Sequence, residues 1–428
     1  MEVKKQIYLS HLAYESFDKK FSRGYFSTFF IIKGFFIAFC LSLFIYLDYF
    51  GLHIKIIDTI LAIFGFYGLL VCQKRTLPWV GFFIGIFWFY WIGFGFQYYD
   101  LTYLIPLAVI GFGLIYALFF WVVSKVGVTQ ELRALLMFGF MFFSPFGFNW
   151  FKPELVFINS YFSTDNYLYG AFLLSIVFMI RLKKWWKLLA VVVLYSLTLF
   201  NKPLHVELPN LDIAIPITNL DQSKKWKKEY RDEIVEYNFS LIKSAVQAKK
   251  DLIILHESAF PLYLNLETTI LNRLKKLSYD IPIVTGGLHV KNNLVYNSSF
   301  FFQDGKLKIA DKVVLVPFGE KIPLPKWARD IINNIFFDGA DDYESAKNVT
   351  NFKIKNYSFR NAICYEATTD TIYKDNPKYM VAISNNAWFS PSIEPTLQRL
   401  LLKLYARKYN TIIYHSANAG ISGIITPY

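Results

Sequence analysis

Three residues in the second half of the chain have side chains that could take part in covalent catalysis. Glu257 follows the apolar run Leu252–Leu255, Cys364 follows the run 361–363, and Lys312 lies in the segment 310–320. A thiol attacks an ester well only as a thiolate, which needs a base or a cation beside it, and an ammonium group can stabilise the oxyanion that forms. These residues could therefore pass an acyl group through a thioester on Cys364, with Glu257 as the base and Lys312 as the oxyanion partner.

Taken one at a time, these residues have plainer explanations. A glutamate at a strand end is usually solvated, a lysine among valines usually extends its ammonium group to water, and a cysteine after Ala-Ile is usually buried packing. A thiol enzyme of the Cys–His kind is a further alternative, with His256, His289 or His415 as the base. The occurrence of the three residues together favours a site.

Metal and nucleotide sites find no support in the sequence. His256-Glu257 begins like the helix of a zinc protease, but Phe260 stands where the second histidine is needed. The chain has no Walker A loop and no Gly-x-Ser-x-Gly segment. Its 3 cysteines are too few for a disulfide framework or a cysteine zinc site, and Cys40 and Cys72 lie in apolar runs. The sequence therefore predicts no cofactor and no metal.

The region 205–428 contains the elements that would position the candidate residues. Apolar runs of strand type alternate with stretches of helical periodicity, and Gln303-Asp-Gly305 between two runs indicates a tight β-hairpin. This pattern predicts one layered α/β domain. The main strands are expected at 211–217, 252–255, 281–285, 296–303, 307–315, 361–365, 380–384, 411–416 and 420–425, and the main helices at 226–249, 267–277 and 394–409.

Residues 1–204 have a different composition. The chain is 54% hydrophobic, yet this region carries only 26 of its 77 charged side chains. Seven apolar stretches approach the roughly 20 residues that a membrane-spanning helix needs, so we expect a membrane domain of seven helices. A transporter, which is the non-enzymatic alternative, would be expected to have charged residues within its spans, and almost none occur here. The stretches are 29–47, 54–72, 78–97, 102–123, 132–150, 167–181 and 185–200.

Basic residues gather in alternate loops of this region. They precede the first stretch, follow the second at Lys74-Arg75 and the fourth at Lys125, and follow the sixth at 181–187. The positive-inside rule then puts the amino terminus in the cytoplasm, and seven crossings put residue 204 outside. Membrane topology thus accounts for much of the net charge of +13. No basic run of the length typical of nucleic-acid binding is present.

Gly81 and Gly85 have the small-xxx-small spacing that lets two helices approach closely. We interpret this spacing as packing between helices of one chain. It gives no argument for a dimer, so we expect a monomer.

The sequence around the candidate residues resembles one protein family in several separate blocks. Together with the apolar stretches ahead of them, the blocks are similar to the apolipoprotein N-acyltransferase family, a branch of the carbon–nitrogen hydrolase (nitrilase) superfamily. The specific matches run from about residue 211 to 425. In chain order the blocks are Asn219 with Gln222 and Lys225-Trp226, Glu257-Ser-Ala-Phe-Pro261, Tyr296-Asn-Ser298, Lys312 with Leu315-Val-Pro-Phe-Gly-Glu320, Ile363-Cys-Tyr-Glu366, and Ser384-Asn-Asn-Ala-Trp-Phe389.

The resemblance implies a fold: a helical membrane bundle at 1–204 and an αββα sandwich at 205–428. It also implies a reaction in which an acyl chain moves from a membrane phospholipid, through a thioester on Cys364, to the amino-terminal amine of a diacylated apolipoprotein. Glu257 and Lys312 would complete the catalytic set, at the periplasmic side of the bacterial inner membrane. A membrane-anchored amidase or hydrolase of the same superfamily is the alternative. The supporting or substrate-binding residues that the resemblance implies are Trp226, Asn297, Glu320, Tyr365, Glu366 and Trp388.

A few positions depart from the family pattern. His256 stands where the family usually has Pro, and Tyr405 and Lys408 stand where its Arg-x-Arg-Ala-x-Glu pattern has the second Arg and the Glu. The last exchange reverses a charge. The family also commonly ends with one more transmembrane helix, so this chain is either cut at Tyr428 or lacks that helix. The catalytic blocks do not include these positions.

Overall fold

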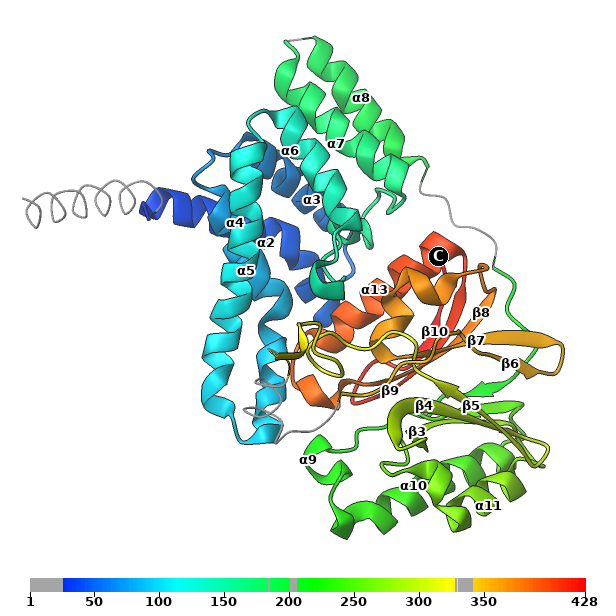
Figure 1. Cartoon of the computed structure of the whole chain (residues 1–428). Helices are drawn as coiled ribbons and strands as arrows, with labels where there is room; N and C mark the ends of the chain where they lie inside the picture. The colour runs from blue at the N-terminus through cyan, green and yellow to red at the C-terminus, as the bar shows by residue number, and fades with distance from the viewer. Residues whose placement is uncertain (1–25, 184, 201–205, 328, 330–341) are drawn as a thin grey trace, which may run out of the picture. The chain divides into compact units, whose positions relative to one another are not determined.

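The computed structural model describes residues 26–183, 185–200, 206–327, 329 and 342–428 (Figure 1). The chain forms two compact units. The helical unit contains the described parts of 1–93, 103–141 and 159–201, and the α/β unit contains 94–102, 142–158 and the described parts of 202–428. The boundary expected between residues 204 and 205, and the basic residues expected before residue 26, lie outside the described residues.

The helical unit consists of apolar helices near the predicted stretches (Figure 1). Within the described residues, three stretches are long and apolar enough to cross a membrane: Thr28–Tyr49, Leu77–Tyr99 and Thr102–Val126. Two further apolar helices, α7 and α8, are shorter. The count of seven crossings therefore stays a prediction. The helices of this unit are α2 (Thr28–Tyr49), α3 (Lys55–Val71), α4 (Leu77–Phe89), α5 (Ile105–Val126), α6 (Gln130–Gly139), α7 (Asn166–Arg181) and α8 (Trp186–Thr198).

The helix expected at 132–150 is wrong in its extent. α6 ends at Gly139, and only short 3-10 turns follow it before residue 158. Pro145 has no N–H group to donate and disfavours helical backbone in the residue before it, which explains why the helix does not continue. Residues 142–158 belong to the α/β unit instead.

The contact between α4 and α5 explains the glycine spacing. A Cβ atom on Gly81 would lie 2.3 Å from the carbonyl oxygen of Tyr116, and one on Gly85 would lie 2.5 Å from that of Phe112. Both neighbours are backbone atoms of α5, so a larger side chain would push the two helices apart. The spacing serves packing within the chain, as predicted.

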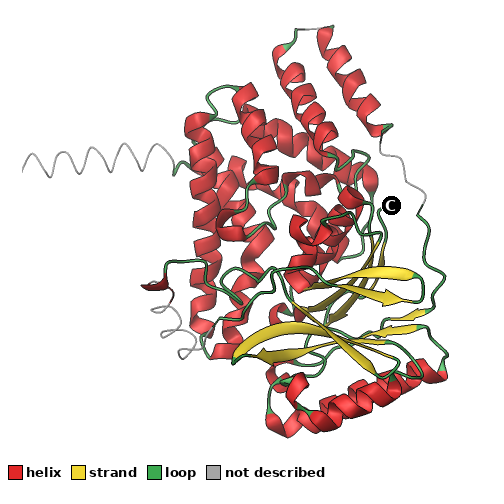
Figure 2. Ribbon diagram, turned by 45° about the vertical axis from the view of Figure 1, so that its right-hand side comes forward, coloured by secondary structure: helices red, strands yellow, loops and turns green. Residues whose placement is uncertain are grey.

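The α/β unit contains two five-stranded sheets (Figure 2). The first has the order β1-β2-β3-β4-β5, with β1, β2 and β3 parallel and the other pairs antiparallel. The second has the order β10-β9-β8-β7-β6, with β7, β8 and β9 parallel. The strands are β1 (Ile213–Ala214), β2 (Leu252–Ile254), β3 (Ile283–Lys291), β4 (Leu294–Gln303), β5 (Lys306–Asp311), β6 (Asn351–Ile354), β7 (Tyr357–Ile363), β8 (Tyr379–Asn385), β9 (Ile412–Asn418) and β10 (Gly423–Ile425).

Three apolar clusters hold these sheets and helices together. One joins the sheets face to face, with Ile254 and Phe301 from the first sheet and Phe359 and Ile383 from the second. A second cluster joins the first sheet to α10 (Arg231–Gln247) and α11 (Thr268–Leu277). A third joins the second sheet to α13 (Glu394–Tyr409). Each sheet is therefore covered on both faces, as its near-continuous apolar strands require.

Local chemistry explains where individual strands begin and end. β4 and β5 form the predicted hairpin, and Asp304 and Gly305 at its turn have positive φ angles of 50° and 73°. Of the strand expected at 211–217, only β1 pairs with a neighbouring strand. β1 ends two residues before Pro216, because proline has no N–H group to donate to the hydrogen bonds between strands.

Candidate active site

The three candidate residues follow the ends of strands from both sheets. Lys312 comes directly after β5 and Cys364 directly after β7, while Glu257 lies three residues beyond the end of β2. β2 and β5 belong to the first sheet and β7 to the second. The packing of the two sheets therefore brings together an acid and an amine from one sheet and a thiol from the other.

Glycine in β3 makes room for the backbone that carries Glu257. A Cβ atom on Gly286 would lie 2.3 Å from the backbone nitrogen of Ser258 and 2.7 Å from the Cα atom of Glu257. Real Cβ atoms do not come so close to backbone, so any other residue here would displace the segment.

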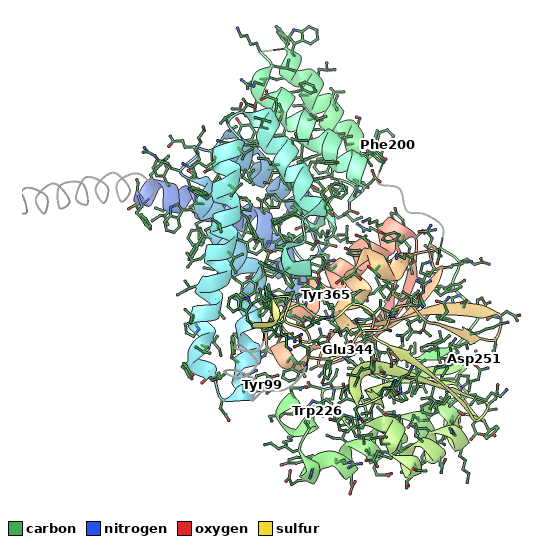
Figure 3. The ribbon with its side chains drawn as sticks, viewed as in Figure 1. Tyr99, Phe200, Trp226, Asp251, Glu344 and Tyr365 are labelled. Atoms are coloured by element: carbon green, nitrogen blue, oxygen red, sulfur yellow. The ribbon has the colours of Figure 1, made fainter. Side chains whose placement is uncertain are left out.

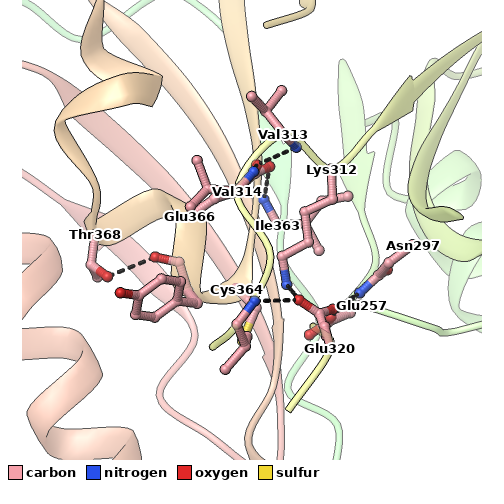
Figure 4. A network of polar contacts seen from close by, with 12 residues as sticks. Glu257, Asn297, Lys312, Val313, Val314, Glu320, Ile363, Cys364, Glu366 and Thr368 are labelled. Atoms are coloured by element: carbon pink, nitrogen blue, oxygen red, sulfur yellow. Dashed lines mark hydrogen bonds and ion pairs between the residues drawn. The ribbon is translucent and has the colours of Figure 1, made fainter. Parts of the chain in front are cut away.

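A polar network connects the acid and the amine (Figure 4). The Nδ2 atom of Asn297 donates to Glu257 Oε1 at 2.7 Å and to Glu320 Oε1 at 2.8 Å. The other oxygen of Glu320 lies 2.7 Å from the ammonium nitrogen of Lys312 and accepts from the backbone N–H of Val316 at 2.8 Å. Glu320 thereby positions the Lys312 ammonium, and Asn297 links both carboxylates.

Cys364 lies at a sharp turn between β7 and a 3-10 helix that begins at the same residue. Its φ angle is 53°, in the left-handed region that non-glycine residues rarely adopt and that is often found at functional sites. Glu366 supports this turn, because one of its oxygens accepts from the N–H of Ile363 at 2.8 Å. The other accepts from Val313 at 2.8 Å and Val314 at 3.1 Å, which connects the turn to the segment after Lys312 (Figure 4).

The charges of these groups influence one another. Burial raises the pKa of the Cys364 thiol and the charge of Glu257 raises it further, while Lys312 lowers it. Burial acts to lower the pKa of Lys312, but Glu320, Glu257 and Cys364 together raise it above its ordinary value. Burial also raises the pKa of Glu257, against the opposing effect of Lys312. The acid, the amine and the thiol therefore lie within electrostatic reach of one another, and the amine is charged at neutral pH.

This arrangement can carry out acyl transfer. The fixed ammonium group of Lys312 can stabilise both a thiolate and an oxyanion, and the buried carboxyl group of Glu257 can accept a proton and return it. Within the described residues, no group of three or more His, Cys, Asp or Glu side chains could hold a metal ion.

The three aromatic residues among the predicted supporting residues lie in different surroundings. Tyr365 is buried, and its hydroxyl donates to the carbonyl of Gly147 at 2.6 Å and accepts from the N–H of Asn149 at 3.0 Å. It therefore anchors the loop that follows the α6 region. Trp388 stacks on Tyr99 with ring centroids 6.2 Å apart. Trp226 is 41% exposed and lies beside α9 (Gln222–Lys225), away from Tyr365 in the view of Figure 3.

The three histidines of the Cys–His alternative have other partners. His256 Nδ1 lies 3.1 Å from the Thr218 hydroxyl, and His289 Nδ1 lies 2.8 Å from Asp311. His415 lies between the Ser384 hydroxyl at 2.9 Å and a backbone carbonyl at 3.0 Å, and burial lowers its pKa to about 4. These contacts do not support a histidine base for Cys364.

Residues outside the predicted set also line the site. Lys225 is buried, and its ammonium group donates to the carbonyl oxygen of Glu257 at 3.0 Å; burial lowers its pKa to about 7 against the charge of Glu257. Glu394 and Gln398 are buried in α13, and Gln398 contacts the thiol. Their spacing of four residues on one helix face is a signal that could have identified them.

The departures at the end of α13 have local compensation. The ammonium group of Lys408 pairs with Asp370 at 2.7 Å, and Tyr405 accepts a hydrogen bond from Asn149 Nδ2 at 3.1 Å. The reversed charge therefore has an acidic partner.

Apolar helices long enough to cross a membrane share this chain with a two-sheet α/β unit in which an acid, an amine and a thiol follow strand ends. These features indicate a membrane-bound enzyme. Comparison with known proteins defines the family. The apolipoprotein N-acyltransferase integral membrane domain matches residues 28–200. An apolipoprotein N-acyltransferase of Wolinella succinogenes is 42% identical over 392 residues, which cover 91% of this chain and 94% of that protein. One of Campylobacter jejuni is 35% identical over 423 residues, covering 98% and 95%. The chain belongs to the apolipoprotein N-acyltransferase family.

A solved structure gives a more distant likeness. A CN-hydrolase superfamily protein from Xanthomonas campestris matches 50% of this chain and 78% of its own, at 15% identity and a TM-score of 0.38.

Proposed function

We propose that Glu257, Lys312 and Cys364 are the catalytic residues and that acyl transfer proceeds in two half-reactions through a thioester on Cys364. In this proposal the apolar helices within residues 1–204 form a membrane domain that crosses the bilayer seven times. Residues 205–428 form a periplasmic αββα sandwich of the nitrilase type at the bacterial inner membrane. The enzyme acts as a monomer. It uses no cofactor and does not bind nucleic acid.

One observation carries this proposal: the acid, the amine and the thiol follow strand ends of two sheets whose apolar faces pack together. The bridge from Glu257 through Asn297 and Glu320 to Lys312 supports a shared site.

In the first half-reaction the substrate is the ester of a membrane phospholipid. Glu257 accepts the thiol proton as the sulfur attacks the ester carbonyl carbon, and negative charge develops on the carbonyl oxygen. The Lys312 ammonium and the backbone N–H of Tyr365 stabilise that oxyanion. The ester C–O bond then breaks, Glu257 returns the proton to the leaving alkoxide, and an acyl thioester remains on Cys364.

In the second half-reaction the acceptor is the amino-terminal amine of a diacylated apolipoprotein. Glu257 takes a proton from the amine as its nitrogen attacks the thioester carbonyl. When the C–S bond breaks, the thiolate leaves beside Lys312 and is protonated again by Glu257. Both substrates are held by acyl chains in one leaflet, so a membrane-anchored catalyst meets them at a raised effective concentration.

The experiment is incubation of the purified full chain with a phospholipid carrying a labelled acyl chain, followed by a diacylated lipopeptide. Mass spectrometry should find the label on Cys364 as a thioester after the first step and on the peptide as an amide after the second. Cys364→Ser should abolish both signals. Glu257→Gln should allow only slow formation of the thioester and should impair the second step, because the thiol and the amine then have no base.

The outcomes separate the candidate functions. Label that appears only as free fatty acid would favour the hydrolase alternative, in which water resolves the thioester. Transfer that persists in Cys364→Ser, or label that is attached elsewhere, would reject Cys364 as the nucleophile. Lys353→Gln, on the exposed face of β6, is the control and should behave as the wild type.

A further inference from the structure

One side chain outside the proposed catalytic set contacts the sulfur of Cys364. The Nε2 atom of Gln398 lies 3.6 Å from Cys364 Sγ, a hydrogen-bond distance for the larger sulfur atom. Gln398 is completely buried in α13, whereas the thiol is partly exposed. The amide therefore approaches the thiol from the interior of the protein.

A second amide holds Gln398. Asn386 lies in the turn after β8, and its Nδ2 atom donates to Gln398 Oε1 at 3.0 Å. With its oxygen occupied in this way, Gln398 turns its N–H group towards Cys364. Asn386 thus acts on the sulfur through Gln398.

A buried carboxyl group sets the direction of the two amides. The Nδ2 atom of Asn386 also donates to both oxygens of Glu394, at 2.9 and 2.7 Å. Glu394 offers at least one acceptor oxygen in either protonation state, so Asn386 must present N–H groups to it. The opposite side of Asn386 faces Gly420, where a Cβ atom would lie 2.2 Å from Asn386 Oδ1.

From this geometry we propose that Gln398 is a further catalytic residue, which donates an N–H group to the Cys364 sulfur and stabilises its thiolate, and that Asn386 and Glu394 are positioning residues that aim it. This inference rests on the proposed role of Cys364 as the nucleophile. It adds a neutral hydrogen-bond donor, Gln398, to the charged group of Lys312. Lys312 attracts the thiolate from the β5 side, and Gln398 binds it from α13. A neutral amide adds this stabilisation without a second buried positive charge beside Lys312.

The test measures the thiol itself. The purified full chain is treated with iodoacetamide over a range of pH, and modification of Cys364 is followed by peptide mass spectrometry so that Cys40 and Cys72 do not contribute. Because a hydrogen bond to a charged group is lost, Gln398→Leu should slow alkylation about tenfold at a fixed pH and move its pH midpoint upward by about one unit. Formation of the acyl thioester from labelled phospholipid should slow in parallel.

A second variant separates the donor from packing. Gln398→Met has a similar length and volume, but it has no N–H group to donate to the sulfur. It should slow alkylation about as much as Gln398→Leu while the protein stays folded. Thr396→Val removes another buried polar side chain of α13 and should leave the alkylation profile unchanged.

A double-mutant cycle tests the positioning role. If Asn386 acts through Gln398, Asn386→Leu should slow alkylation in the wild-type background and have no further effect in the Gln398→Leu background. Additive losses would overturn the positioning role of Asn386. Alkylation and thioester formation that match the wild type in both Gln398 variants would overturn the whole proposal. Failure of the underlying function has a different signature, namely transfer that persists in Cys364→Ser.

Discussion

At the scale of single residues, the ion pair between Lys312 and Glu320 determines the charge at the site. The ammonium group is fully buried, and burial alone would favour its neutral form. Glu320, at 2.7 Å, is the strongest of the charges that oppose this effect. Lys312 therefore depends on Glu320 for the positive charge that the proposed mechanism needs.

Glu320→Gln should move the loss of activity at alkaline pH towards neutrality. The carboxylate raises the pKa of Lys312, so its removal lets burial lower that pKa. The ammonium group then loses its proton at a lower pH, and thioester formation should decline there. Single-turnover formation of the Cys364 thioester, measured against pH, gives the shift. Glu236→Gln breaks an exposed ion pair with Arg273 and should leave the profile unchanged. An unshifted profile in Glu320→Gln would contradict the role assigned to the pair.

At the scale of elements, the position of Glu257 depends on how closely β3 approaches the segment after β2. Gly286→Ala introduces a Cβ atom 2.3 Å from a backbone nitrogen and should displace Glu257, with a cost in stability of about 1–3 kcal/mol. Both acyl transfer and the midpoint of thermal unfolding should fall. In the neighbouring Gly287→Ala the new atom meets the Leu264 side chain at 3.0 Å, so the loss should be smaller. Equal effects in the two variants would show that the Glu257 segment is not held by this contact.

The pair α4 and α5 allows a similar test in the helical unit. Gly81→Ala should lower the unfolding midpoint in detergent, because its Cβ atom would lie 2.3 Å from the Tyr116 carbonyl oxygen. Gly111→Ala in α5 is the matched control, since no atom lies within 4 Å of the added carbon. If both variants unfold at the wild-type temperature, close packing at Gly81 does not contribute to stability.

At the scale of the whole molecule, the proposal requires the α/β unit and the loop after α3 to lie on opposite sides of the membrane. In a variant whose native cysteines are replaced, Lys353→Cys in β6 should react with a membrane-impermeant maleimide in spheroplasts. Gln73→Cys, after α3, should react only after permeabilisation. Both positions are exposed on the protein, so membrane side alone decides their reactivity. The reverse pattern would put the site in the cytoplasm and reject the periplasmic assignment.

The sequence predicted the local elements well where one signal dominated. The helix at 394–409 and the hairpin at Asp304-Gly305 depend on periodicity and turn chemistry, and both were predicted correctly. The helix at 132–150 was wrong, because apolar character alone does not show that Pro145 ends helical backbone and that the residues after it pack with the α/β unit.

By itself, the sequence determined the composition of the two regions, the strand ends that carry Glu257, Lys312 and Cys364, and the resemblance to a family, because these properties depend on residue type and local order. Only the tertiary structure decided which side chains meet. Asn297 joins two carboxylates, Lys225 contacts the Glu257 backbone, and Gln398 contacts a sulfur 34 residues away. Such contacts depend on how two sheets and a helix pack, and side-chain contacts across elements leave no periodic signal in a single sequence.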